Sequence, residues 1–141
     1  MATGSKMFKL GMANWTKKVG LHAEALARQS IFNLCESVVS DTKVDTGNLR
    51  GNWQPSLGAP VTNEIDAARG VIDIGGVIQG MKIGDHFFMV NNAAYALRIE
   101  FGFVGTDSLG RKYNQKGDYN VTTNLKRWPE HVARAASELG L

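Results

Sequence analysis

One long helical pattern in the first third of the chain limits the fold more than any other feature. Between residues 14 and 40, apolar or small side chains recur at steps of three and four, which places them on one side of a helix. These residues are Trp15, Val19, Ala23, Leu26, Ser30, Leu34 and Val38. Asn14 is a favourable N-cap. The pattern predicts a long amphipathic helix from Asn14 to about Ser40, one side of which packs against other elements.

The middle of the chain predicts short strands separated by turns. Asp41 to Gly47 has turn composition, and a strand over residues 49–54 would then end at Pro55. Residues 55–68 lack periodicity and predict a loop or a loose hairpin arm. Two further strands are predicted, over residues 69–74 and 86–90, and residues 77–83 predict a weak strand or more loop.

The second half predicts two further helices on either side of a long loop. Asn91 or Asn92 can cap a short helix over residues 93–101, which Gly102 would end. Residues 103–119 are rich in glycine, charge and amides, and predict a long loop. A terminal helix is predicted from six apolar residues at alternating steps of four and three: Val121, Leu125, Trp128, Val132, Ala135 and Leu139. Pro129 should kink this helix or mark its first turn.

These elements predict an α+β fold. An antiparallel β-sheet with a long hairpin arm over residues 49–74 would be packed by the long N-terminal helix, the short central helix and the C-terminal helix. A chain of 141 residues is long enough for one domain, which we expect to span residues 1–141. Residues 1–13 would form a flexible, polar N-terminal arm.

Charge is unevenly distributed although the net charge is only +3. Four lysines precede the first acidic residue, Glu24: Lys6, Lys9, Lys17 and Lys18. A second basic stretch includes Arg111, Lys112 and Lys116. Basic patches of this kind can meet nucleic-acid phosphates or an acidic protein, and they also occur as solvated loops and ends.

The sequence offers little evidence of catalysis or of cofactor or metal binding. No phosphate-binding loop, dinucleotide fingerprint or nucleophile motif is present, and the three histidines lie in different predicted elements. We therefore expect no enzymatic activity and no catalytic, cofactor or metal site. The sole cysteine, Cys35, suits a reducing cytoplasm and is predicted to be a small core residue. No apolar run resembles a signal peptide or approaches the length of a membrane span, so no membrane contact is expected.

Two separated segments instead suggest contacts with other proteins. Val44 to Arg50 is a turn that leads to Trp53, and Asn91 to Ala96 leads to Glu100 and Gly102. The candidate interface residues are Asp45, Thr46, Gly47, Leu49, Arg50 and Trp53 in the first segment, and Tyr95, Arg98, Glu100 and Gly102 in the second. Trp53 could be core or an interface hot spot. Glu100 could form a local ion pair or a polar contact across a subunit boundary, and the sequence leaves both open.

The order of these features resembles that of the tail-completion, or neck, proteins of long-tailed bacteriophages. In that family an Asp-Thr-Gly-x-Leu-Arg turn precedes a strand, and a Tyr-Ala-x-x-x-Glu-x-Gly segment follows the sheet. The corresponding residues here are Asp45, Thr46, Gly47, Leu49 and Arg50, then Tyr95, Ala96, Glu100 and Gly102. The resemblance spans about residues 14 to 139, and the longer, more basic loop at 103–119 departs from the pattern.

The resemblance implies a structural virion protein that assembles in the bacterial host cytoplasm. Its subunits would form a homo-oligomeric ring, commonly six-fold, at the head–tail junction. The ring would join the head connector or stopper to the tail tube or tail terminator and let DNA pass through its lumen. Arg111, Lys112 and Lys116 are the candidate DNA-facing residues. Two other interpretations stay open: a tail-terminator ring that caps the tail tube, and, from another class, a small basic nucleic-acid-binding module.

Overall fold

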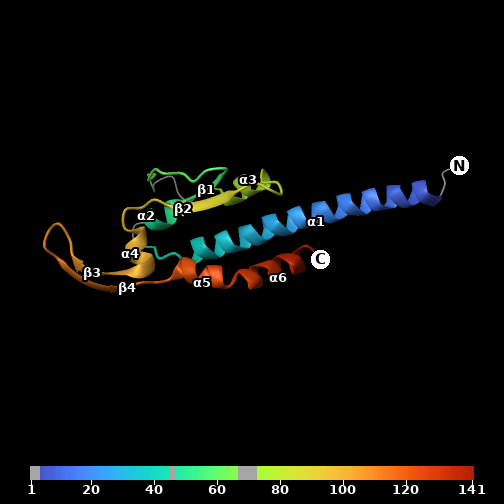
Figure 1. Ribbon diagram of the computed structural model, residues 1–141. Helices are drawn as coiled ribbons and strands as arrows, with labels where there is room; N and C mark the ends of the chain where they lie inside the picture. The colour runs from blue at the N-terminus through green and yellow to red at the C-terminus, as the bar shows by residue number, and fades with distance from the viewer. Residues whose placement is uncertain (1–3, 45–46, 67–72) are drawn as a thin grey trace.

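The computed structural model describes residues 4–44, 47–66 and 73–141 (Figure 1). Its first element, α1, runs without interruption from Gly4 to Asp41 and is about 57 Å long at about 1.5 Å per residue. Only the second half of α1 packs against the rest of the described chain, where Ser30, Cys35 and Val38 are buried. Residues 11–23 are exposed on all sides, and the helix extends well beyond the other elements (Figure 1).

The long N-terminal helix is thus confirmed, but its predicted start at Asn14 is wrong. Residues 4–13, expected to be a flexible arm, form the first turns of α1. No proline interrupts this segment, and Met7, Lys9 and Met12 are good helix formers. Asn14 therefore lies inside the helix.

The first sheet consists of β1 (Trp53–Leu57) and β2 (Phe87–Asn91), paired antiparallel from Trp53 opposite Asn91 to Leu57 opposite Phe87. The core lies between this sheet, α1 and α3 (Ile74–Gln79). Its buried residues are Cys35, Ile74 and Ile78, against which Ile31, Phe32, Val39, Phe87 and Met89 pack. The predicted strand at 86–90 is therefore confirmed with a shift of one residue.

Three other predictions in this region are wrong. Residues 49–51 belong to a short helix, α2 (Asn48–Gly51), so the strand begins only at Trp53 and Pro55 lies inside it. Proline is tolerated there because β1 is an edge strand of a two-stranded sheet. Ile74 and residues 77–79 are helical in α3, where burial of Ile74 and Ile78 one turn apart outweighs the poor helix propensity of Gly75 and Gly76.

A hairpin arm over residues 49–74 is not seen among the described residues, where β1 pairs with β2. Residues 69–72 of that predicted strand lie outside the described residues. A different hairpin is present where a loop was predicted. β3 (Gly102–Thr106) and β4 (Lys112–Lys116) pair antiparallel and extend away from the body at the end opposite the free end of α1 (Figure 1).

Helices connect this hairpin to both sides of the body. α4 (Ala96–Phe101) precedes β3 and ends at Gly102, as predicted, although it begins at Ala96. After β4 the chain forms α5 (Asn120–Lys126) and α6 (Trp128–Glu138), separated at Arg127. Pro129 lies in the first turn of α6, which confirms one of its two predicted roles. The mixture of helices and antiparallel sheets confirms the α+β class.

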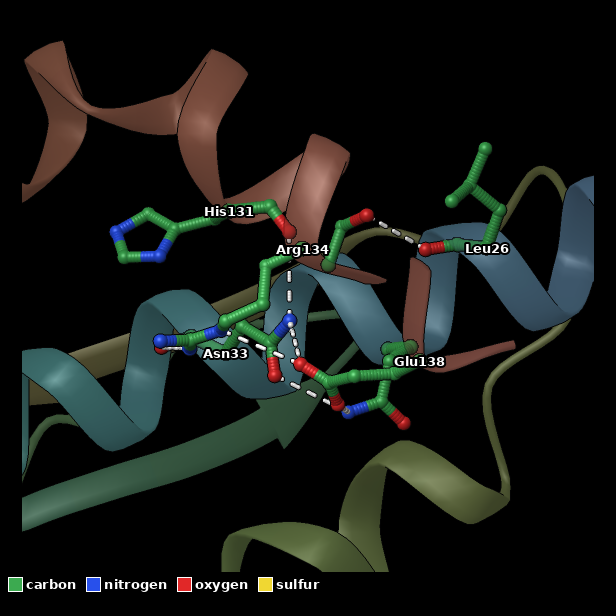
Figure 2. A network of polar contacts seen from close by, with 7 residues as sticks. Leu26, Asn33, His131, Arg134 and Glu138 are labelled. Carbon is green, nitrogen blue, oxygen red and sulfur yellow. Dashed lines mark hydrogen bonds and ion pairs between the residues drawn. The ribbon is translucent and has the colours of Figure 1, made fainter. Parts of the chain in front are cut away.

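Buried polar groups fix α6 against α1 (Figure 2). The Asn33 amide donates to the carbonyl oxygen of His131 at 3.3 Å and to Glu138 at 3.3 Å, and Gln29 donates to the same carboxylate at 2.9 Å. Arg134 forms an ion pair with Glu138 at 3.3 Å. Since Asn33 and His131 are almost fully buried, this network specifies how the two helices pack.

Candidate subunit-contact surface

The two segments singled out in the sequence meet in the structure. The Asn91 amide donates to the carbonyl oxygen of Leu49 at 2.7 Å, and the Asn48 amide donates to the Tyr95 hydroxyl at 3.3 Å. Gly47 adopts a left-handed φ of 86° immediately before α2, where glycine avoids the steric cost of a side chain. Asp45 and Thr46 lie outside the described residues. The rest of the first segment and the second segment therefore form one continuous region.

Arg50 ties α2 to the end of α1. Its guanidinium donates to the carbonyl oxygens of Ser40 at 3.0 Å and Thr42 at 2.9 Å. The last carbonyls of a helix lack partners within the helix, and a cation is favoured there. Arg50 thus satisfies backbone carbonyl groups at the C-terminal end of α1, and its guanidinium is engaged in hydrogen bonds within the chain.

Trp53 joins the same corner of the molecule. Its indole nitrogen donates to the Thr42 hydroxyl at 2.9 Å, and Asn120 donates to that hydroxyl at 3.2 Å and to the carbonyl oxygen of Val38 at 2.9 Å. The ring of Trp53 is only partly buried and lines two adjoining surface pockets. Trp53 therefore contributes both to the internal packing and to an exposed surface.

Glu100 acts as a cap for α5. Its carboxylate accepts hydrogen bonds from the backbone N–H of Val121 at 3.0 Å, from that of Thr122 at 2.8 Å and from the Thr122 hydroxyl at 2.9 Å. A carboxylate at this position satisfies N–H groups that have no partner within the helix and interacts favourably with the helix dipole. Among the described residues no cation lies within ion-pair distance of Glu100, so the predicted ion pair is absent there, and a contact across a subunit boundary stays a prediction.

Gly102 holds the base of the β3–β4 hairpin. It has a φ of 84°, and a Cβ there would lie 2.5 Å from the carbonyl oxygen of Gln115. Across the base, a Cβ on Gly117 would clash with the carbonyl oxygen of Glu100. These two close approaches, together with a hydrogen bond from the Asp118 N–H to the carbonyl of Ile99 at 2.8 Å, fix the hairpin relative to α4.

Tyr95 and Arg98 are the exposed ones among the candidate interface residues of the second segment. The Arg98 guanidinium lies 4.0 Å from the ring centroid of Phe103, a cation–π contact. Both residues line a pocket of about 640 Å³ with Leu49 and the hairpin residue Tyr113. In this pocket side chains of both segments reach solvent together.

A second exposed feature, which we call the apolar groove, escaped the sequence reasoning. Two adjoining pockets of about 400 and 510 Å³ share Trp53, Met89, Val121 and Leu125. Leu97 and Phe101 line one end, and Leu34 and Trp128 line the other. Leu125 and Trp128 belong to the C-terminal apolar pattern predicted to be buried, yet Leu125 is 55% exposed. The C-terminal apolar pattern identified these residues of the groove. It could not show that no other element in the described chain covers them.

The three basic candidates lie on the β3–β4 hairpin and differ in their surroundings. Arg111 forms an ion pair with Asp107 at 2.6 Å. Desolvation raises the pKa of Asp107, but hydrogen bonds from Arg111, Leu109 and Tyr113 outweigh it and lower that pKa overall. Lys112 and Lys116 are exposed, and no described carboxylate lies within ion-pair distance of either. These two lysines carry the free positive charge of the hairpin.

Within residues 4–44, 47–66 and 73–141, no group of three or more His, Cys, Asp or Glu side chains is arranged to hold a metal ion. None of the described helices combines the length and apolar character needed to cross a membrane. No protein-family model matches the chain, and comparisons with curated proteins and with solved structures gave no match either.

Proposed function

We propose that this chain is a structural virion protein of a tailed bacteriophage, which forms an oligomeric ring at the head–tail junction and has no catalytic role. The observation that carries the proposal is the meeting of the two signature segments. Asn91 bonds to Leu49 and Asn48 bonds to Tyr95, so motifs more than forty residues apart build one surface. In a neck protein the two corresponding motifs would likewise meet and build one surface.

The elongated shape supports assembly into a ring. A closed ring requires a heterologous interface, in which each subunit presents two different surfaces to its two neighbours. This chain carries the exposed residues 11–23 of α1 at one end and the β3–β4 hairpin at the other (Figure 1). The apolar groove is lined by residues of β2, α4 and α5. Contiguous exposed apolar patches mark places of contact with other molecules.

The hairpin supports a contact with passing DNA in the lumen. Lys112 and Lys116 are exposed and unpaired among the described residues, so they can meet phosphates through electrostatics that do not depend on base sequence. Two lysines give weak, salt-sensitive binding by a single subunit, and a ring would multiply them around the channel. The partners would be the head connector or stopper on one side and the tail tube or tail terminator on the other.

Removal of the gene tests the proposal directly. In the phage or prophage that encodes the chain, its deletion should yield full heads and complete tails that do not join, and the wild-type gene supplied in trans should restore joined particles. Electron microscopy of the particles gives the result. Normal joined virions from the deletion strain would refute the proposal.

Two further measurements separate the alternatives. Density for the chain at the tail end of isolated tails would favour a tail-terminator ring, whereas density between connector and tail favours the neck. A nucleic-acid-binding module predicts tight binding of a DNA duplex by the free chain at moderate salt, with loss of binding after K112E and K116E. The neck function predicts that the free chain binds the same duplex weakly or not at all.

A further inference from the structure

The projecting helix, residues 11–23 of α1, carries an apolar stripe that no other described element covers. Met12, Trp15 and Val19 are spaced by three and four residues, so they share one side of the helix. Trp15 is 60% exposed, Met12 45% and Val19 44%. The stripe continues the same periodic pattern that is buried further along α1, and it therefore has the character of a packing surface without a partner.

A helix of this kind gains little stability on its own. Residues 4–23 extend about 30 Å at about 1.5 Å per residue, and most of the stability of a helix in a protein comes from packing of one side against other elements. The segment also includes Gly11 and Gly20, which weaken a helix further. A partner that covers the Trp15 side would supply the missing stabilisation.

The charge of the projecting segment restricts what that partner is. No acidic residue occurs before Glu24, whereas lysines occur at positions 6, 9, 17 and 18. The apolar groove has the opposite character. Four carboxylates line its two pockets, from Asp41, Asp85, Glu100 and Asp118. Glu100 caps α5 and Asp118 pairs with Lys43 at 2.8 Å, so the exposed Asp41 and Asp85 carry the negative charge that the groove offers to a partner.

We propose that the projecting helix of one copy of this chain docks in the apolar groove of a second copy. Trp15, Met12 and Val19 would enter the groove beside Leu125 and Leu97, and Lys9 and Lys18, which flank this side of the helix, would face its acidic rim. Amphipathic helices bind apolar grooves through anchors spaced in this way. The helix leaves one end of the molecule (Figure 1), and the groove is lined by residues of β1, β2, α4 and α5, so each copy can donate a helix and accept another.

This head-to-tail contact rests on the proposed ring function, for which it names the surfaces that join neighbouring subunits. A heterologous contact leaves one free helix and one free groove in every open chain of subunits, so it continues until the ring closes. The electrostatic part of the contact weakens with ionic strength because the lysines and carboxylates are near the surface.

Two complementary variants of the full-length chain test the contact by analytical ultracentrifugation over a wide concentration range. W15E removes the donor surface, and L125E or L97E removes the acceptor surface. Each variant alone should stay monomeric where the wild type associates. An equimolar mixture of W15E and L125E should form a complex of two chains and nothing larger, because one good helix and one good groove remain.

Matched controls use exposed apolar residues outside the contact. Each residue advances about 100°, so Leu21 lies about 120° from Trp15 and on the opposite side of the projecting helix from Met12. Ile83 lines neither pocket of the groove. L21E and I83E should associate like the wild type. Circular dichroism verifies that every variant is folded.

Several results would overturn the contact. Monomeric wild type at every concentration would do so, as would association that survives both W15E and L97E. Loss of association in W15E but not in either groove variant would indicate pairing between projecting helices. Joined virions from a gene deletion would remove the ring function while leaving a measured helix–groove contact intact, so the two proposals fail separately.

Discussion

Substitution of Glu100 by alanine gives the sharpest test of how the second segment works. The carboxylate accepts three hydrogen bonds at the start of α5, two of them from backbone N–H groups. Alanine would leave these N–H groups without their partner in a partly buried site. We therefore expect E100A to lower the stability of the isolated chain as well as any effect it has on assembly.

The size of the loss follows from the contacts. A hydrogen bond to a charged group contributes about 1.5–3 kcal/mol, and loss of a helix cap typically costs about 1 kcal/mol. Because the three bonds share one carboxylate they do not add, and we expect a loss of about 2–3 kcal/mol. For a chain of this size that lowers Tm by about 10 °C. Urea denaturation followed by circular dichroism measures the free energy, and a thermal scan measures Tm.

E130A is the matched control. Glu130 is also a carboxylate in an early helical turn, but it is exposed and pairs only with Arg127 at 2.9 Å. Its removal should change the free energy of unfolding by less than about 0.5 kcal/mol. If E100A proves as stable as E130A, the capping role is refuted, and a contact across a subunit boundary becomes the better explanation of Glu100.

Three further predictions concern other parts of the chain. Burial, and then the charges of Arg134 and Arg127, lower the pKa of His131; the unfolded chain therefore binds a proton below about pH 6.5 that the folded chain resists, and stability should fall as the pH drops from 7 to 5. Urea denaturation at both pH values should show a smaller loss for H131Q. G102A should destabilise the hairpin by about 3 kcal/mol in the same assay, whereas G110A, with a φ of 77° but open space, should cost about 1 kcal/mol. Burial raises the pKa of Cys35 to about 12, so a thiol reagent at pH 8 should label it only at the rate at which the chain unfolds.

The long N-terminal helix and the C-terminal helical segment were predictable from the sequence because their apolar periodicity records which side packs, whereas residues of the short helices α2 and α3 were predicted as strand or loop. α1, α4 and the C-terminal helices were each anticipated, and Pro129 marked the start of α6. The start of α1 at Gly4 was not, because no local signal separates a free helix from a flexible arm. That difference depends on whether a partner is present to stabilise the segment.

The strands and hairpins were harder to predict because their pairing depends on distant residues. β1 pairs with β2 across about thirty intervening residues, and this pairing replaced the expected local hairpin. The β3–β4 hairpin was concealed by polar composition, since its exposed strands lack an apolar face. In retrospect, the turn around Asp107 and Gly110 was its signal: the Asp107 carboxylate accepts from the Leu109 and Arg111 N–H groups, both at 2.9 Å.

The candidate interface residues divide into those that build a surface and those that present one. Arg50, Glu100 and Gly102 direct their polar groups or backbone contacts inward, to the end of α1, to the start of α5 and to the base of the hairpin. Residues that do face solvent, such as Leu97 and Leu125, have no distinctive motif. Sequence motifs in this chain thus mark positions where hydrogen bonds or close backbone approach restrict which residue fits. An apolar contact surface restricts its residues only in size and hydrophobicity, so it leaves no motif in the sequence. It becomes recognisable once the fold shows which apolar side chains remain uncovered.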